Sequence, residues 1–364
     1  MIIQKIKEIF INNKKLHCFI IGGDISCASN YRPYNLSIAL KEKGLNILVI
    51  CKNIKSNTKF IKNLEDKGIN VRTYHKNKIF SLLQTRLILF KLNPIFIYQT
   101  NPTLRSFLSL FLTNYQIIGD WDEPDLLKYN NGIRKYLSIF LHRWFLKRCV
   151  VKVSCTKYYQ KFIPNSFYIP HGQYIKKTYS NFDLQGKKEK YFAYLGNFYS
   201  LWDHDLLFEG LLKAKKNGFQ PIIKFIGDGP EYTKWINFSK LNNLDNIIFT
   251  GFLSHADLMI ILKNAHALLF PMRDTPINKS RCPSKIFAYI ASKRPVIAHE
   301  VGEIKSLLLG KAKLYNPSID LIDELRTLPE NLLDVNYEDE KYSYTLIAEK
   351  YIKLIGTIRS NKKI

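Results

Sequence analysis

Acidic side chains, paired cysteine motifs and long apolar runs are scarce in this 364-residue sequence. The chain has 30 Asp and Glu residues against 55 Lys and Arg residues, which gives a formal net charge of +25. Residues 1–172 hold 27 of the basic residues and only 9 of the acidic ones. This uneven charge favours an anionic partner for the first half: a membrane surface, a nucleic acid or an acidic substrate.

Targeting and redox features are also few. Residues 1–16 are interrupted by charges and contain no apolar core of a secretory signal. The most apolar stretch, residues 79–98, is interrupted by Gln84, Arg86 and Lys91, which excludes a spanning helix. The six cysteines show neither a CxxC pair nor zinc-ligand spacing. We therefore expect reduced thiols in a cytoplasmic protein.

Short apolar runs alternate with amphipathic ones, a pattern typical of parallel sheets covered by helices. We expect an α/β fold with two doubly wound domains, residues 1–172 and 191–340, joined by a polar linker over 173–190. Residues 341–364 are predicted to form a helix that packs back across the cleft between the domains. The expected strands are residues 17–21, 46–50, 95–98, 116–118, 150–153, 191–195, 222–226, 247–250, 267–270 and 295–298. The expected helices include residues 32–42, 104–112, 133–148 and 205–216.

A helix that begins at Pro283 is the most informative local feature. Proline suits a first helical turn, where its missing amide would be unpaired anyway. The amides of Ser284, Lys285 and Ile286 are expected to point out of the helix start, where the helix dipole favours an anion. Arg281 and Lys285 add two cations, so a diphosphate fits the site. The alternative is an ordinary helix start beside two solvated basic residues.

Two glycine motifs follow predicted strands in the same half. In Ile-Gly-Asp-Gly-Pro-Glu, Gly227 and Gly229 flank Asp228 and would allow a ligand to approach the backbone closely. In the second motif, Phe252 follows Gly251 at the end of the next predicted strand, where a nucleobase could stack on its ring. The alternative for Phe252 is a core aromatic.

These motifs together resemble a known family. Gly196 after its strand, IGDGPE, NIIFTGFLSHADL, a strand ending in FP, NxxRxPxKxFxY and AxxRPVIAxxVGE occur in the family's order. The set resembles the donor-binding domain of GT-B glycosyltransferases, in particular the family-4-type (group 1) bacterial enzymes of surface-polysaccharide synthesis. The resemblance implies the GT-B fold, two Rossmann-like domains facing a central cleft. It also implies a nucleotide-sugar donor on the C-terminal domain, an acceptor on the N-terminal domain, and no cofactor or obligatory metal.

The resemblance assigns roles to individual residues. Arg281, Ser284 and Lys285 match the family's phosphate contacts, and Asp274 and Asn278 lie in its sugar-facing segment. The other donor-side candidates are Gly196, Asn197, Gly227, Asp228, Gly229, Phe252 and Glu303. Two features depart from the family: relatives carry a carboxylate for the ribose hydroxyls where this chain has Ala288, and the family's usual Arg and Lys after the Gly196 strand are missing. The missing carboxylate could weaken ribose binding, shift that role to Glu300 or Glu303, or mark a degenerate enzyme.

Carboxylates of the N-terminal half concentrate after the strand at residues 116–118. A carboxylate at a strand's carboxyl end could deprotonate an acceptor hydroxyl. Asp120 and Asp122 are our candidates for this base, and Glu123 follows them. Helix capping is an equally simple role for Asp122. A metal-binding DxD motif is disfavoured, because the phosphate-binding residues lie in the other half of the chain.

Four further residues are candidates for the acceptor site or the cleft. Gly22 and Gly23 match the loop after the first strand, and Arg32 starts the following helix. His171 occupies the family's interdomain turn, where a hinge role is the alternative. His204 is expected at the surface.

The sequence thus predicts a hexosyltransferase that acts on a glycan or lipid-linked glycan. Family acceptors are often polyprenyl-diphosphate-linked, so the basic-aromatic stretches at residues 5–15 and 140–148 suggest peripheral binding to the inner face of an anionic membrane. The alternatives are a catalytically degenerate glycan- or partner-binding module and a nucleotide-sugar 2-epimerase. A nucleic-acid binder is disfavoured, because no recognition motif accompanies the charge.

Overall fold

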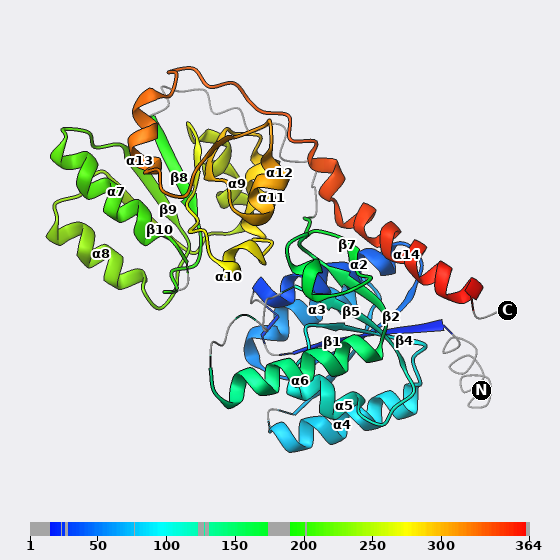
Figure 1. The fold of residues 1–364 in the computed structure, drawn as a ribbon. Helices are drawn as coiled ribbons and strands as arrows, with labels where there is room; N and C mark the ends of the chain where they lie inside the picture. Colours follow the sequence, from blue (N-terminus) through cyan, green and yellow to red (C-terminus); the bar gives the residue numbers. More distant parts are fainter. Residues whose placement is uncertain are drawn as a thin grey trace. The chain divides into compact units, whose positions relative to one another are not determined.

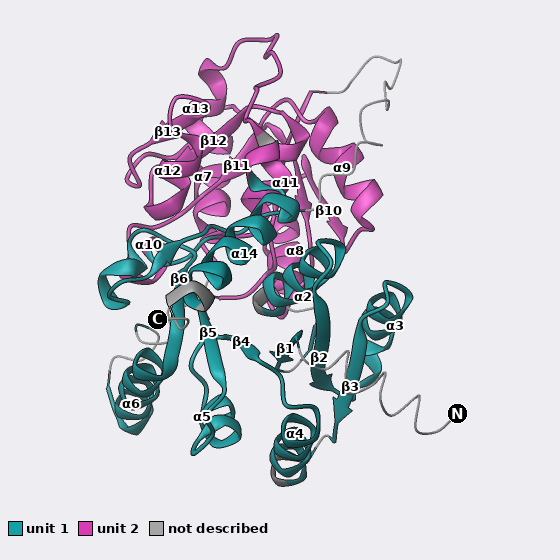
Figure 2. Ribbon diagram, turned by 90° about the vertical axis from the view of Figure 1, so that its right-hand side faces the viewer, with its two compact units in different colours: residues 1–174, 280–282, 342–364 teal, residues 175–279, 283–341 magenta. Residues whose placement is uncertain are grey.

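The computed structural model describes residues 15–22, 24–25, 28–75, 77–122, 127, 131–173, 190–200 and 202–361. The chain divides into two compact units (Figure 2). Unit 1 comprises residues 1–174, 280–282 and 342–364, and unit 2 comprises residues 175–279 and 283–341. Among the described residues, no helix has the length and apolarity needed to cross a bilayer.

Unit 1 is built on a seven-stranded parallel sheet with the order β3-β2-β1-β4-β5-β6-β7. Its strands are β1 (Leu16–Ile21), β2 (Asn46–Lys52), β3 (Asn70–Tyr74), β4 (Phe96–Thr100), β5 (Gln116–Trp121), β6 (Cys149–Ser154) and β7 (Phe167–Tyr168). Every residue of β1 is buried, as expected for a central parallel strand with both faces covered.

Two helical layers cover this sheet (Figure 1). The helices are α2 (Ala28–Glu42), α3 (Thr58–Asp66), α4 (Lys78–Leu92), α5 (Leu104–Leu110), α6 (Ile133–Arg148) and α14 (Tyr344–Asn361). Helices α2, α3 and α14 contribute to one apolar cluster, and α4, α5 and α6 contribute to another. The two layers therefore lie on opposite faces of the sheet.

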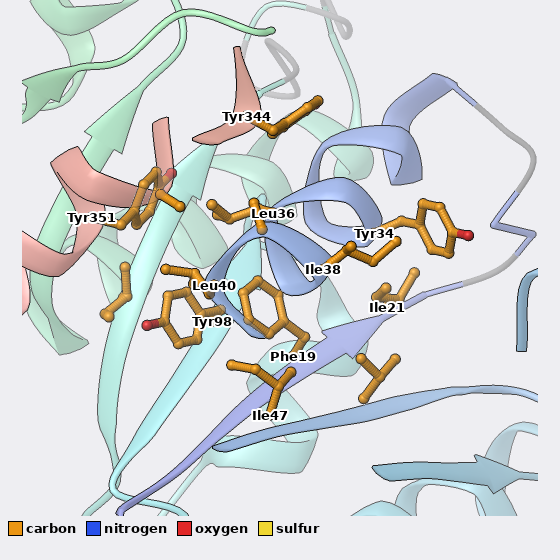
Figure 3. Packing of buried hydrophobic residues seen from close by; sticks show 14 of the residues in the cluster. Phe19, Ile21, Tyr34, Leu36, Ile38, Leu40, Ile47, Tyr98, Tyr344 and Tyr351 are labelled. Atoms are coloured by element: carbon orange, nitrogen blue, oxygen red, sulfur yellow. The ribbon is translucent and has the colours of Figure 1, made fainter. Parts of the chain in front are cut away.

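The C-terminal helix α14 is part of the core of unit 1. It packs along α2, and Tyr344, Ile347 and Tyr351 are almost fully buried in the cluster around Phe19 and Tyr98 (Figure 3). The last helix of the chain therefore completes a core that begins with its first strand.

Unit 2 is built on a six-stranded parallel sheet with the order β10-β9-β8-β11-β12-β13. Its strands are β8 (Tyr191–Leu195), β9 (Ile222–Ile226), β10 (Ile247–Gly251), β11 (Leu268–Phe270), β12 (Val296–His299) and β13 (Lys313–Tyr315). Its helices are α7 (Asp205–Lys216), α8 (Tyr232–Leu241), α9 (His255–Asn264), α10 (Pro276–Lys279), α11 (Lys285–Ser292), α12 (Gly302–Leu308) and α13 (Leu321–Glu324). Helices α7, α8 and α13 share one apolar cluster with the sheet.

Two parallel α/β sheets confirm the predicted fold class. Nearly all of the predicted linker lies outside the described residues, and so do Gly23 and Glu123. At its start, the amide of Gln173 donates to the carbonyl oxygen of Tyr342 (2.9 Å), which joins the end of the first segment to the segment that leads into α14.

Candidate functional site

The loops after β8 and β9 pack directly against each other. The amide of Gly196 donates to the Ile226 carbonyl oxygen (3.0 Å), and the amide of Phe198 donates to the Asp228 carbonyl oxygen (3.1 Å). A Cβ atom at Gly227 would lie 2.0 Å from the Gly196 carbonyl oxygen, and its φ of +129° is one that side chains rarely adopt. Contact between the two loops thus explains Gly227 without any ligand.

This pairing leaves two polar side chains at the loop surface. Asn197 and Asp228 are exposed, and the Asp228 carboxylate accepts a hydrogen bond from the Gly229 amide (2.7 Å). Phe252, just after β10, is 86% exposed. Because it lies outside the core, its ring is open to stacking.

Asp203 organises the loop between β11 and α10. Its carboxylate accepts hydrogen bonds from the backbone amide of Arg273 (3.0 Å) and the side-chain amide of Asn278 (2.8 Å). Arg273 also donates two parallel hydrogen bonds to Asp205 (2.8 Å each). These bonds to Asp205 raise the pKa of the Arg273 guanidinium, although its partial burial acts to lower that pKa. The loop is therefore held by charged groups of its own unit.

The two predicted sugar-facing residues of this loop differ in accessibility. Asn278 is buried, and its amide also donates to the Arg273 carbonyl oxygen (2.9 Å). Asp274 is exposed and pairs with Lys279 (2.6 Å). Asp274 is open to a ligand, whereas Asn278 shapes the loop.

Lys285, in the first turn of α11, lies among aromatic rings. Its Nζ is 4.3 Å from the centroid of the Tyr194 ring and 4.5 Å from that of Phe270, and it donates to the Tyr194 hydroxyl (3.3 Å). Burial lowers the pKa of Lys285 to about 7, although the charge of Asp203 acts in the opposite direction. A cation in such surroundings gains from an arriving anion.

The start of α11 differs from the prediction in two details. The helix begins at Lys285 rather than at Pro283, which lies before its N-cap residue. The amide of Ile286 donates to the carbonyl oxygen of Pro283 (3.1 Å), so it is not the free donor that we expected. Ser284 precedes the helix as its N-cap residue, and its side chain makes no capping bond. Ser284 and Lys285 therefore remain as the candidate amide donors.

Three other donor-side positions are placed as follows. Arg281 lies in the segment Ser280–Cys282 that groups with unit 1, where the Thr156 hydroxyl donates to the Ser280 carbonyl oxygen (3.4 Å). Glu303 is buried in the first turn of α12, and Ala288 is half-buried on α11.

A buried ion pair lies at the carboxyl end of β5 in unit 1. Arg32 is fully buried, and its Nε lies 2.7 Å from Asp120 Oδ2. The same carboxylate oxygen accepts from the Tyr351 hydroxyl (2.6 Å), and Arg32 donates to the carbonyl oxygens of Ile169 and Pro170 (2.9 and 2.8 Å). This network joins α2, β5 and α14. Arg32 and Asp120, both predicted as site residues, form their hydrogen bonds within it.

Asp122 and His171 form a second buried pair next to the first. The imidazole Nε2 of His171 contacts the Asp122 carboxylate, and the Asp122 amide donates to Asn101 Oδ1 (2.9 Å). Burial would raise the pKa of Asp122, but His171 and Arg32 outweigh it and lower that pKa. Asp122 is therefore held as a carboxylate.

Cys155 adds a thiol to this pair. The carboxylate, imidazole and thiol atoms of Asp122, His171 and Cys155 lie within 4.8 Å of one another, all buried. Burial raises the pKa of Cys155 well above its usual range, which favours the neutral thiol over the thiolate that binds metals. The trio is better described as a hydrogen-bonded cluster than as a metal centre.

A further sequence expectation was wrong, and one set of residues was missed. His204 is buried against Phe198 and Trp235 rather than at the surface (ring centroids at 5.1 and 5.3 Å). The rings around Lys285 were missed, because buried strand aromatics such as Tyr194 look like any core residue in sequence. Gly22 is exposed, and its carbonyl oxygen accepts from the Asn30 side chain (2.6 Å).

Part of the chain matches a known protein family. Residues 189–331 match the model of the family described as glycosyl transferases group 1. No curated protein sequence matches the chain. The match spans most of unit 2, and together with the fold it confirms the predicted resemblance to GT-B glycosyltransferases of group 1, the GT4 type.

Three solved structures illustrate the likeness in fold. HepE of Anabaena, solved with UDP and glucose, superposes with a TM-score of 0.70 at 11% identity, covering 93% of this chain and 99% of that chain. The lipopolysaccharide outer core galactosyltransferase WaaB gives 0.64 at 14% identity, with 94% and 99% covered. A variant of S. aureus TarM, in a complex that includes UDP, gives 0.69 at 14% identity, with 93% and 99% covered.

Proposed function

We propose that this protein transfers a hexose-type sugar from a nucleotide-sugar donor to a glycan or lipid-linked glycan. Unit 2 would hold the donor, with its diphosphate at Lys285 and the start of α11. The desolvated ammonium of Lys285 among aromatic rings carries this assignment, because it is stabilised by a bound anion. HepE, whose fold is similar, was crystallised with UDP-glucose.

The donor chemistry follows from charge development. As the bond between the sugar and the diphosphate breaks, negative charge grows on the leaving oxygen. Lys285, Arg281 and the amides at the helix start would stabilise this charge, an effect of about 3–4 kcal/mol per well-placed donor. Phe252 would stack on the base, and Asp274 and Glu303 would take sugar or ribose hydroxyls. Asn197 and Asp228, on the exposed loop surface, would line the donor, and Asn278 would shape the sugar-facing loop.

For the acceptor side, we propose that unit 1 positions the attacking hydroxyl. Asp122 and His171 are our candidates for the pair that accepts the proton of the acceptor hydroxyl. A charged carboxylate in contact with an imidazole orients the ring and stabilises the charge that the ring gains when it accepts a proton. The bonds of Asp120 to Arg32 and Tyr351 suit a supporting role better. We further propose that no metal is obligatory, so transfer should survive EDTA.

A thermal-shift screen against UDP, GDP, TDP and CDP and their sugars tests the donor site. We expect a shift with at least one nucleotide and its loss in Lys285→Ala. Lys224→Ala is the matched control, because Lys224 also lies over a tyrosine ring of unit 2 (3.8 Å from Tyr191). An unchanged shift in Lys285→Ala would place the diphosphate elsewhere.

Ala288 favours a second candidate, a degenerate binding module, because it cannot accept hydrogen bonds from ribose hydroxyls. A nucleotide-sugar 2-epimerase is a further alternative on this fold. Incubation with the donor alone and then with an acceptor separates the three. Conversion without acceptor indicates epimerisation, transfer requires acceptor, and binding without any turnover indicates the degenerate module.

A further inference from the structure

Helix α4 packs Leu89 into the core but also exposes four large apolar side chains and buries two small polar ones. Phe80, Leu83 and Phe90 are 62%, 61% and 79% exposed and, with Leu87, follow the i, i+3, i+7, i+10 spacing of one helical stripe. On the opposite side, Ser81 and Thr85 are buried toward the sheet. On a helix whose outer face meets only water, that face carries polar side chains, so the exposed apolar stripe of α4 is unusual.

Helix α6 carries a similar stripe that continues into basic residues. Ile133, Tyr136 and Phe140 are exposed, and the same side of the helix continues with exposed Arg143 and Lys147. The helix therefore presents an apolar first half and a cationic second half outward. Helices that lie in a membrane interface use the same side chains, aromatic and aliphatic groups together with Lys and Arg.

Helix α5 joins the two stripes into one surface. Phe107 contacts Phe111 and, across to α6, Phe140 (centroids at 4.9 and 5.3 Å). On the other side, the Arg86 guanidinium of α4 donates to the Phe111 carbonyl oxygen (2.6 Å). Figure 2 shows the three helices side by side on the face of the sheet opposite α2 and α14. We call this surface, formed by the exposed side chains of α4, α5 and α6 and by Phe111 and Leu112, the α4–α6 face.

The charge of the α4–α6 face has one sign. The three helices contain no Asp or Glu, and their nine basic residues are Lys78, Arg86, Lys91, Arg105, Arg134, Lys135, Arg143, Lys147 and Arg148. A second copy docked through the same face would bring like charges together, which disfavours self-association. Apolar stripes combined with cations match a surface that is both apolar and anionic.

We infer that the α4–α6 face docks unit 1 on an anionic lipid bilayer, with the aromatic and leucine side chains in the headgroup region and the basic residues on lipid phosphates. This inference deepens the proposed function, because a lipid-linked acceptor would have to be met at such a surface. It extends the membrane contact that the sequence placed at residues 140–148, on α6, to a surface that also includes α4 and α5. No spanning segment is required.

Vesicle flotation tests the inference on the full-length chain. Vesicles of phosphatidylcholine alone are compared with vesicles that contain phosphatidylglycerol as well. We expect binding to the anionic vesicles only, weakened by high salt. The triple variant Phe80→Ser, Leu83→Ser, Phe90→Ser and the double variant Arg143→Glu, Lys147→Glu should each reduce the bound fraction about tenfold or more.

Leu241→Ser and Lys240→Glu are the matched controls, because both change exposed residues of unit 2. They should bind vesicles like the wild type. Equal loss in the controls, or full binding by both face variants, would overturn the inference. A change of molecular mass in the face variants without a change in vesicle binding would instead assign the face to a protein contact.

Two further measurements keep the test decisive. If the triple variant fails to fold, Phe90→Trp alone should show a blue-shifted emission on addition of anionic vesicles, and an unshifted emission would count against docking. The nucleotide thermal shift should persist in the face variants, because the donor site lies in unit 2. Lost nucleotide binding with retained vesicle binding would refute the proposed function and leave this inference standing.

Discussion

Lys285 is the residue whose chemistry depends most on its surroundings. With a pKa of about 7 it is roughly half neutral at neutral pH, whereas an exposed lysine is fully charged. A bound diphosphate should restore the charge, so binding at pH 8 should take up close to one proton. Affinity should fall as pH rises above 7, by up to about tenfold per unit. Calorimetry in buffers of different ionisation enthalpy measures the uptake.

The control for this effect is Lys224→Met, which should leave the proton uptake intact. Lys285→Met should abolish it. Proton uptake near zero in the wild type at pH 8 would show that Lys285 does not meet the phosphates.

Gly227 should tolerate no side chain. Alanine there places its Cβ against the carbonyl oxygen of Gly196 in addition to the strain of a positive φ. We expect Gly227→Ala to lower the free energy of unfolding by about 3 kcal/mol. Gly218→Ala shares the positive φ but has open space around it, so it should cost only about 1 kcal/mol. Urea denaturation compares the two, and equal costs would contradict the close loop contact.

Single residues of the site were predictable where a local motif carried them. Lys285 follows from the predicted helix start at Pro283, two residues before the observed one, and the glycines follow from their place after strands. The pairing of Arg32 with Asp120 was not predictable, because 88 positions separate them and sequence gives no register between α2 and β5. Both residues were selected for their chemistry, and their burial emerges only from packing.

At the scale of elements, regular periodicity was informative, whereas of the edge strands β3, β7, β10 and β13 only β10 was predicted. Helix α6 has the predicted bounds, residues 133–148. The edge strands β3 and β13 were not predicted, because their sequences, NVRTY and KLY, mix charged and apolar residues at the sheet margin. Strand β5 runs three residues beyond its predicted end, to Trp121, because Gly119 and Asp120 look like a loop in sequence but pair with β6.

The attachment of α14 to unit 1 can be dissected at Tyr351. Tyr351→Phe removes only the hydroxyl that contacts Asp120 and Arg32, so we expect a loss of about 1.5–3 kcal/mol. Tyr351→Ala also opens a cavity under α14 and should cost about 3–5 kcal/mol. Chemical denaturation gives both values, and the exposed Tyr136→Phe should change stability by less than about 0.5 kcal/mol. If Tyr351→Phe were as stable as the wild type, the hydrogen bonds of the Tyr351 hydroxyl to Asp120 and Arg32 would not stabilise the fold.

At the scale of the whole molecule, acid should weaken the fold in a defined window. Burial lowers the pKa values of four imidazoles, His142, His204, His266 and His299, which lie in both units. Because the unfolded chain binds more protons below about pH 6.5, stability is lost as pH falls from there, by up to about 1.4 kcal/mol per unit for each imidazole. Urea midpoints at pH 7.5 and 5.5 measure this, and equal midpoints would refute it.

The place of α14 has a consequence for biosynthesis. During translation, the strands of unit 1 leave the ribosome before unit 2 does, but the helix that covers α2 emerges only after unit 2. At elongation rates of about 5–20 residues per second, the nascent sheet waits on the order of ten seconds or more with part of its apolar face open. All of unit 2, together with residues 280–282 of unit 1, is synthesised within that interval. The domain that starts first is therefore the one that must finish last.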